Sequence, residues 1–469
     1  MTDLIDFRST PLSVLAANVR SGAVTAEQLT RHALAQIDMR NGRVNAFVAV
    51  DGPAAITQAT AIDAAVARGE NPGPLAGIPI GVKDLEHAAG FRTTFGSLHH
   101  VDDPIQVDDS IEVARLRAAG CVIVGKTNTP EHGHKGDTDN RIFGPTFNPY
   151  DLARSAGGSS GGSGAAVAAG MVPLCTGSDG GGSIRIPSAI NGLFGMKCSL
   201  GRVAIGGPQG SAWADLSVRG PMAHRVADVA LALDVVAGPH PSDLRCLPGR
   251  VEFMAAATAA TRPQRIGYSP TLGFAPVDSG VAALTRSAVE KLADAGADIV
   301  EIPTVWGTDP LSAFLVFSNV GTLYEMQQYR ANGGWDLLDQ GLRAMLERAE
   351  NTITATGFAG ALSAAHRLNF QLTAAMENVD VLITPLFAAP TPLQGQFGIL
   401  NGTPEPNWVR FTYGFNITRS PVSAVPFGLD ANGMPICIQI VGAQHDDAGV
   451  IAASAWAESI FDFTPPTLA

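Results

Sequence analysis

The spacing of hydrophobic residues predicts helices at the start of the chain. Apolar residues recur at helical intervals over 11–20, 26–39 and 55–69. Thr25, followed three residues later by Gln28, matches the capping box that begins a helix, and Asn41-Gly42 matches a helix end. We therefore expect a helical N-terminal region in which the second helix begins after Thr25 and ends near Asn41.

After residue 70 the pattern changes to short apolar runs that are typical of strands. These runs lie at 78–82, 121–124, 265–268, 298–302, 380–384 and 436–441. Helical patterns separate several of them, at 110–118, 280–295 and 447–460. The segment 311–379 is helix-rich without a strong strand signal and is a candidate inserted cap. Because strand patterns occur on both sides of this segment, we expect one continuous sheet in an α/β protein.

Glycine and serine dominate residues 155–210, but hydrophobic residues are interleaved throughout, as at 165–169 and 171–174. A flexible Gly/Ser linker would lack those apolar residues. This segment is therefore expected to be ordered and packed into the protein.

Composition and charge exclude several classes of protein. The chain has 469 residues, 46% of them hydrophobic and 16% charged, a balance that argues against disorder. The net charge is −12 and no broad basic cluster is present, so nucleic acid is not an expected partner. Asp3 and Asp6 lie where a secretory leader would be basic or apolar, and no long apolar stretch follows, which predicts a cytoplasmic protein without membrane contact.

The cysteines are expected to be reduced and buried. Their irregular spacing, without any CxxC pair, fits neither a disulfide framework nor a zinc site. They are Cys121, Cys175, Cys198, Cys246 and Cys437.

Two motifs suggest other chemistries, but their context argues against both. Residues 120–127 match the phosphate-binding pattern G-x-x-x-x-G-K-[ST], yet 121–124 reads as a strand, and an extended strand cannot enclose a phosphate. His132 and His134 lie near Glu131 and Asp137 without a third histidine at a structural-site spacing, so we expect a polar loop and no metal. The pair His99-His100 is expected to form hydrogen bonds.

Three segments carry the groups that acyl transfer requires: 77–84 (GIPIGVKD), 157–163 (GGSSGGS) and 177–187 (GSDGGGSIRIP). Three glycines precede Ser183, so their N–H groups can converge on an oxyanion and Ser183 is a candidate nucleophile. No histidine lies in these segments, which makes Lys83 the candidate base. Burial must then lower its pKa from about 10.4 to about 7 or 8. Taken separately, each segment is also explained as an ordinary strand, loop or turn.

Together these segments resemble the amidase signature family of Ser-Ser-Lys amidohydrolases. Further matching motifs are VGKTNTPE at 124–131, FGPTFNPYD at 143–151, and FNITRSPVSAVPFG and GMPICIQIVG near the C-terminus. The resemblance covers most of the chain and implies the amidase signature fold, a central mixed β-sheet covered by helices on both faces. It implies one domain, 1–469, made of N-terminal helices (10–70), a catalytic core (about 71–265), a helix-rich insert completing the pocket (about 305–380), and C-terminal strands and a helix (380–462).

The same resemblance implies roles for individual residues. Lys83 would be the base, Ser159 the serine that relays the proton, and Ser183 the acylated nucleophile, with a cis peptide bond between Gly158 and Ser159. The oxyanion hole would consist of the backbone amides of Gly180, Gly181, Gly182 and Ser183, supported by Ser160, Asp179 and Arg185. No cofactor and no metal are implied, and homodimers are common in the family. Gly180 replaces a usual threonine, which predicts a more mobile loop and a wider site.

The expected function is hydrolysis of C–N bonds in small-molecule carboxylic amides by a stand-alone enzyme. Aryl amides, carbamates (urethanes) and esters are further candidate substrates. One alternative is the glutaminase component of the glutamyl-tRNA amidotransferase, its A chain, although Ile186 and residues 128–134 depart from the usual motifs of that protein. Another is a non-catalytic anion-binding protein. Phe314, Phe317, Tyr324 and Trp335 are candidate pocket aromatics, with core packing as their alternative role.

Overall fold

A large mixed sheet forms the centre of the protein. The computed structural model describes residues 5–207 and 212–469. Within these ranges eleven strands form one sheet in the order β1-β3-β2-β4-β6-β5-β12-β13-β9-β7-β8, and β10 and β11 form a separate hairpin. The strands are β1 Phe47–Val50, β2 Pro79–Lys83, β3 Val122–Thr127, β4 Leu174–Asp179, β5 Phe194–Lys197, β6 Val218–Ala223, β7 Arg265–Tyr268, β8 Asp298–Glu301, β9 Val381–Pro385, β10 Gly398–Leu400, β11 Thr403–Glu405, β12 Val422–Leu429 and β13 Pro435–Val441.

The sheet has a group of parallel strands near each end and antiparallel strands in the middle, and its edge strand β1 pairs antiparallel with β3. Strand β2 pairs in parallel with β3 and β4, and β7 pairs in parallel with β8 and β9. Strands β6, β5, β12 and β13 join these groups through antiparallel pairs. The predicted continuous mixed sheet is therefore confirmed, with strands from both sides of the helix-rich segment in it.

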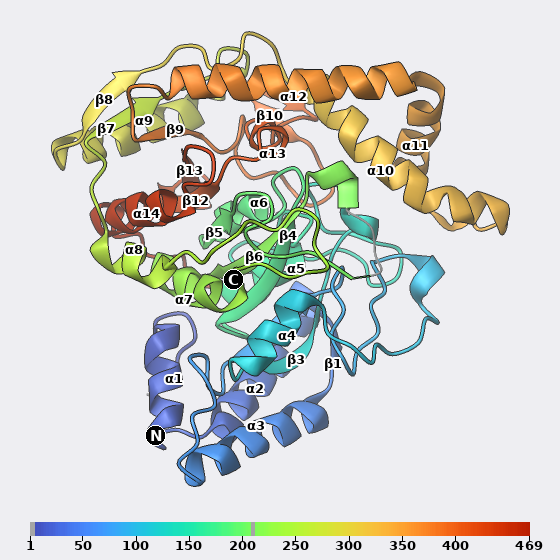
Figure 1. Ribbon diagram of the computed structural model, residues 1–469, viewed down its shortest axis with the longest axis vertical. Helices are drawn as coiled ribbons and strands as arrows, with labels where there is room; N and C mark the ends of the chain where they lie inside the picture. The colour runs from blue at the N-terminus through green and yellow to red at the C-terminus, as the bar shows by residue number, and fades with distance from the viewer. Residues whose placement is uncertain (1–4, 208–211) are drawn as a thin grey trace.

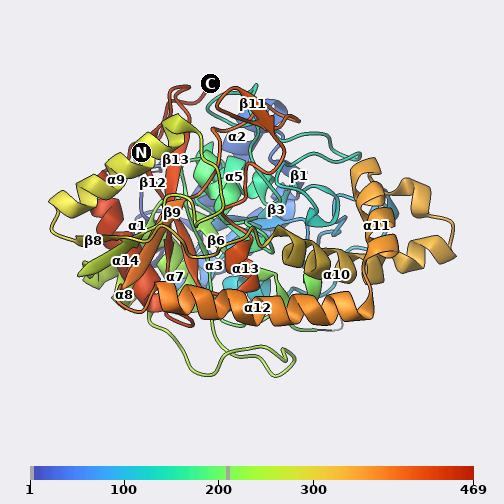
Figure 2. The same cartoon turned by 90° about the horizontal axis from the view of Figure 1, so that it is seen from above.

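Helices cover both faces of this sheet (Figures 1 and 2). Helix α5 packs on β2 and β4, whereas α7 and α14 pack on β6 and β12 from the opposite face. The helices are α1 Leu12–Arg20, α2 Ala26–Val44, α3 Gly52–Ala67, α4 Ile111–Ala118, α5 Gly161–Ala168, α6 Arg185–Ile190, α7 Val226–Val236, α8 Phe253–Ala259, α9 Ser279–Asp294, α10 Leu311–Ala331, α11 Gln340–Thr352, α12 Ala355–Ala375, α13 Gly414–Ile417 and α14 Asp447–Phe461. Helices α10 to α12 form the predicted helix-rich segment, and α12 crosses one end of the molecule in Figure 1.

The Gly/Ser-rich segment is an ordered part of the core. Helix α5, strand β4 and helix α6 all lie in it, and every residue of α5 and α6 is buried. Small residues let these elements pack closely, because a Cβ on Gly162 would lie 2.2 Å from the backbone nitrogen of Asn128. The prediction that this segment is no linker is confirmed for the described part; residues 208–210 lie outside it.

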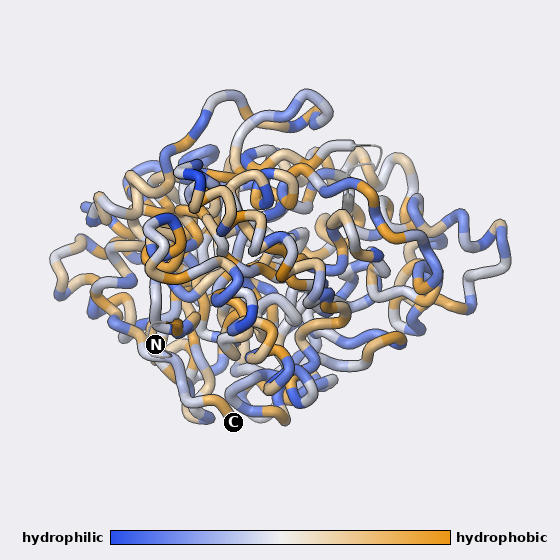
Figure 3. The backbone as a smooth tube through the Cα atoms, turned by 90° about the horizontal axis from the view of Figure 1, so that it is seen from below, coloured by the Kyte–Doolittle hydropathy of each residue, from blue (hydrophilic) through white to orange (hydrophobic). Residues whose placement is uncertain are grey.

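Figure 3 shows hydrophobic segments concentrated in the interior and mostly hydrophilic ones in the projecting loops.

The cysteine prediction holds except at one residue. All five cysteines are free, and four are buried, but Cys246 is partly exposed, on the loop that follows α7. Across residues 5–207 and 212–469, no helix is long and apolar enough to cross a membrane. Residues 1–4, which include Asp3, lie outside the described chain.

Candidate active site

Two adjacent parallel strands position the candidate base and residues 180–183, which we call the glycine loop. Lys83 is the last residue of β2, and Asp179 is the last residue of the neighbouring strand β4. The carboxyl ends of parallel strands meet at one edge of a sheet, so both side chains lie at that edge. Ser159 is close by because α5, which begins two residues after it, packs on both strands.

Lys83 is completely buried and bonded to two serines. Its Nζ lies 2.8 Å from Ser159 Oγ and 2.9 Å from Ser178 Oγ. Burial lowers the pKa of Lys83 from its ordinary 10.5 to about 7, although the negative charges of Glu86 and Asp179 partly oppose this change. A substantial fraction of Lys83 is therefore neutral at pH 7, and a neutral lysine can accept a proton.

Ser159 and Ser183 line the same small cavity. The cavity has a volume of ≈ 90 Å³, and its walls also include Leu85, Gly133 and Trp213. The peptide bond between Gly158 and Ser159 is cis, as expected. Ser183 is 8% exposed, and no hydrogen bond between its Oγ and Ser159 is present among the described residues. The structure thus places Ser159 and Ser183 on one cavity, and it joins the buried Lys83 to Ser159 by a direct hydrogen bond.

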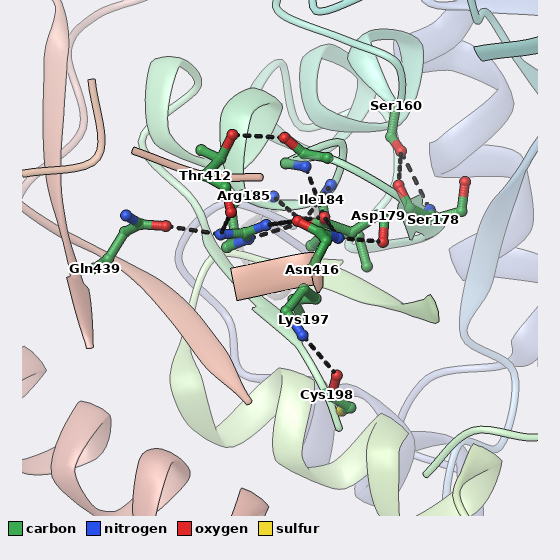
Figure 4. A network of polar contacts seen from close by, with 12 residues as sticks. Ser160, Ser178, Asp179, Ile184, Arg185, Lys197, Cys198, Thr412, Asn416 and Gln439 are labelled. Carbon is green, nitrogen blue, oxygen red and sulfur yellow. Dashed lines mark hydrogen bonds and ion pairs between the residues drawn. The ribbon is translucent and has the colours of Figure 1, made fainter. Parts of the chain in front are cut away.

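Asp179 holds the glycine loop in place (Figure 4). Its carboxylate accepts hydrogen bonds from the backbone N–H of Gly182 at 2.7 Å and of Ile184 at 3.3 Å. It also pairs with Arg185, whose Nε lies 2.9 Å from Oδ2 and whose Nη2 lies 3.0 Å from Oδ1. Burial opposes the charged carboxylate, but Arg185 and the hydrogen bonds hold the pKa of Asp179 well below its usual range. The loop is therefore fixed by a buried carboxylate that stays ionised.

Residues from the C-terminal part of the chain complete this network. Arg185 donates to Gln439 Oε1 at 2.8 Å, to the backbone oxygen of Thr412 at 3.0 Å and to Asn416 Oδ1 at 2.7 Å. Asn416 in turn donates to Asp179 Oδ1 at 2.9 Å. Sequence reasoning named Asp179 and Arg185 but assigned no role to these three partners, although Asn416 and Gln439 lie in the two C-terminal motifs.

The backbone amides of the glycine loop do not all point to the same place. Gly182 donates its N–H to Asp179, so this amide is already used inside the protein. Within the described chain, the hydrogen bonds leave the N–H groups of Gly180, Gly181 and Ser183 uncommitted. Gly182 serves another purpose: its φ is +128°, and a Cβ there would lie 2.7 Å from Thr412 Oγ1.

Ser178 is a contact of Lys83 that sequence reasoning did not identify. The backbone N–H of Ser178 donates to Ser160 Oγ at 3.3 Å, and the hydroxyl of Ser160 donates to the Ser178 carbonyl at 3.4 Å. Ser160, predicted as a support, therefore supports Ser178. No spacing rule distinguishes Ser178 from the other serines of the segment, since its role depends on how β4 lies beside β2.

Only one of the four candidate pocket aromatics reaches the glycine loop. A Cβ on Gly181 would lie 2.6 Å from the Phe314 ring, whereas Phe317, also on α10, is buried in the core. Tyr324 is 77% exposed. The Arg330 guanidinium lies over the Trp335 ring, with 3.8 Å between Arg330 Cζ and the ring centroid. Trp213, which sequence reasoning did not single out, lies against Gly180 instead.

The phosphate-loop match and the histidine motifs lie in ordinary structural elements. Residues 122–127 form β3, and the buried Lys126 pairs with Asp84 at 2.9 Å, so no phosphate loop exists there. His134 Nε2 lies 3.3 Å from Asp339, while His132 contributes to the cavity wall. His99 Nε2 and His100 Nδ1 are hydrogen-bonded to Gly334 and Asp103. In the part of the chain that the structure covers, no three His, Cys, Asp or Glu side chains are grouped to hold a metal ion.

Comparison with known proteins identifies the family of the chain. The Amidase family model matches residues 28–451. An acylamidase of Rhodococcus erythropolis is 33% identical over 95% of this chain and 94% of its own length. The A component of the glutamyl-tRNA(Gln) amidotransferase of Salinispora tropica is 34% identical over 100% of both chains. The crystal structure of a bacterial aryl acylamidase superposes with a TM-score of 0.91 at 27% identity, covering 97% of each chain. The chain thus belongs to the amidase signature family and is an amide-hydrolysing enzyme.

Proposed function

We propose that this protein is a stand-alone amidase that cleaves small carboxylic amides, aryl amides among them, through an acyl-enzyme on Ser183. The observation that carries the proposal is the buried contact between Lys83 Nζ and Ser159 Oγ, beside a cavity that Ser183 also lines. A neutral lysine hydrogen-bonded to a serine is a base–relay pair, and such a pair activates a second hydroxyl.

In this mechanism neutral Lys83 takes a proton from Ser159, which takes one from Ser183 as its Oγ attacks the amide carbonyl carbon. The negative charge that develops on the carbonyl oxygen is stabilised by the N–H groups of Gly180, Gly181 and Ser183. The tetrahedral intermediate collapses and the C–N bond breaks as Ser159 gives its proton to the leaving nitrogen and takes one back from protonated Lys83, which becomes neutral again. Water then attacks the acyl group by the same relay and restores Ser183.

Two features support an enzyme that acts alone on small molecules. Acylamidases are among its relatives, and the walls of the cavity include the apolar side chains of Leu85, Ile205 and Trp213. The amidotransferase component is an equally extensive match, so the competing function is hydrolysis of glutamine within a complex. Activity of the purified chain on amides without a partner separates the two. Carbamates are further candidate substrates, because attack on their carbonyl needs the same nucleophile and the same oxyanion stabilisation.

The experiment is release of 4-nitroaniline from 4-nitroacetanilide and from a matching N-aryl carbamate. Ser183→Ala is expected to abolish turnover, and Ser159→Ala and Lys83→Met to lower kcat by several orders of magnitude. Ser217→Ala, which removes another hydroxyl from the same cavity, is the matched control and should retain turnover. Full activity of Ser183→Ala would overturn the proposal. Glutamine hydrolysis that appears only with a partner protein would establish the competing function.

A further inference from the structure

The ring of Trp213 lies in the space that a side chain at residue 180 would occupy. A Cβ placed on Gly180 would lie 2.7 Å from Trp213 Cε3 and 3.1 Å from Cζ3. Side chains do not approach an aromatic ring that closely, so the indole can lie here only because residue 180 is glycine. The expectation that glycine at this position widens the site is therefore wrong, since the ring of Trp213 fills the space.

The indole is held in this position by a row of aromatic rings. Trp213 meets Phe314 edge to face, with ring centroids 6.3 Å apart at 70°. Phe314 stacks on Tyr413 at 5.1 Å, and the Tyr413 hydroxyl donates to Asp309 at 2.7 Å. Helix α10, which carries Phe314, thus supports Trp213 from behind, and the ring forms a fixed wall of the cavity.

The mechanism indicates which part of the substrate faces this wall. Ser159 returns a proton to the leaving nitrogen, so the leaving group lies on the Ser159 side of the cavity. Gly133 borders that side without a side chain, and a Cβ there would lie 3.1 Å from Ser159 Oγ and 2.9 Å from Leu85 Cδ1. The acyl group therefore lies against the walls beside the oxyanion amides, where Trp213 covers Gly180.

We propose that Trp213 is a specificity-determining residue: its ring, seated on Gly180, closes the acyl side of the cavity and selects amides of short acyl groups. This inference rests on the proposed function, because it assigns the acyl side from the role of Ser159. Removal of the ring opens that side.

The test compares acetyl, butyryl and octanoyl 4-nitroanilides in the wild type and in Trp213→Ala. The wild type is expected to lose kcat/KM as the acyl group lengthens, and Trp213→Ala is expected to raise the octanoyl-to-acetyl ratio by about tenfold or more. Trp335→Ala, which removes a tryptophan from the helix-rich segment, is the control and should leave the ratio unchanged. An unchanged ratio in Trp213→Ala would overturn the inference while leaving the amidase function intact.

A second measurement uses the fit between the two residues. Gly180→Thr should lower both Tm and activity, and adding Trp213→Ala should restore much of the Tm, because the threonine then takes the space of the ring. Equal Tm losses with and without Trp213 would contradict the packing that the inference requires.

Labelling of Ser183 separates failure of the inference from failure of the proposed function. If the wild type hydrolyses no anilide, inactivation by methyl and octyl fluorophosphonates measures the same chain-length preference directly. Faster labelling by the octyl reagent in the wild type would overturn the inference. Absence of labelling by both reagents would overturn the proposed function, and the inference with it.

Discussion

Lys83 Nζ lies 2.8 Å from Ser159 Oγ, and neither residue is more than 3% exposed. Water therefore does not solvate the ammonium form of the lysine well, and the proton of Lys83 is weakly held. The pH dependence of the enzyme follows from this contact.

The rate should rise with pH around neutrality. Since burial lowers the pKa of Lys83 to about 7, the side chain is protonated and inactive as a base below that pH, and neutral above it. We expect kcat/KM for 4-nitroacetanilide to increase through a midpoint near pH 7 and to level off at higher pH. A profile that is flat from pH 5.5 to 9, or that rises only near the ordinary pKa of lysine, about 10.4, would exclude Lys83 as the base.

Glu86→Gln should move this midpoint to lower pH. The negative charge of Glu86 favours protonated Lys83 and raises its pKa, and Glu86 also pairs with Arg219 at 3.3 Å. Without that charge, Lys83 loses its proton at lower pH, and Arg219 is no longer neutralised. The measurement is the pH profile of kcat/KM, and Glu350→Gln, in an exposed ion pair, is the control. A midpoint that moves upwards would contradict the assignment.

Ser178→Ala should lower kcat by about tenfold, as expected for loss of one hydrogen bond that positions a catalytic group. Ser178 Oγ lies 2.9 Å from Lys83 Nζ and fixes its direction, so KM should change little. Ser178→Thr keeps the hydroxyl and should restore most of the rate. If threonine rescues no better than alanine, Ser178 acts through packing and not through this bond.

Asp179→Asn should destabilise the protein by roughly 3–5 kcal/mol, because it leaves the buried Arg185 without its anionic partner. Both side chains of this pair are 0% exposed. The change also weakens the bond to the Gly182 amide, so activity should fall even where the protein remains folded. Thermal unfolding and kcat measured on the same sample test both parts. A variant with wild-type Tm would show that the pair is not needed for stability.

Gly182→Ala should inactivate the enzyme and lower its Tm more than Gly144→Ala does. Both glycines have positive φ, +128° and +75°, but only at Gly182 would the new Cβ meet neighbouring atoms, at 2.7 Å. The control variant thus measures the cost of backbone conformation alone, which is about 1 kcal/mol. Equal effects of the two substitutions on Tm and on activity would mean that contact with Thr412 does not constrain the loop.

Local patterns predicted many elements but not all of their limits. The capping box at Thr25 begins α2 as expected, yet the helix runs through Gly42 to Val44 and ends at Asn45, whose φ is +55°. Asn41, read as a helix end, instead accepts the backbone N–H groups of Ala46 and Phe47 with its side chain. Tertiary hydrogen bonds outweigh the local signal there.

The sequence pattern did not predict strand β6. Its residues include Arg219, Gly220 and Pro221, which weaken any strand pattern, but it pairs with both β4 and β5 in the sheet. Candidate site residues were predictable where a motif carries them, as at Lys83, Ser159 and Ser183. Trp213 lies in none of these motifs. Asn416 lies in a C-terminal motif, but its role was not predictable, since it acts on Asp179, which is distant in sequence.

The network around Asp179 also determines at which stage of protein synthesis the site can form. Lys83, Ser159 and Ser183 all lie in the first half of the chain, whereas Thr412, Asn416 and Gln439, which hold Arg185, lie near its end. The ribosome therefore synthesises the three candidate reacting residues long before it synthesises the residues that hold Arg185 in place. The proposed mechanism thus requires almost the whole chain, and we expect a prematurely terminated chain to carry the candidate reacting groups without the residues that hold Arg185.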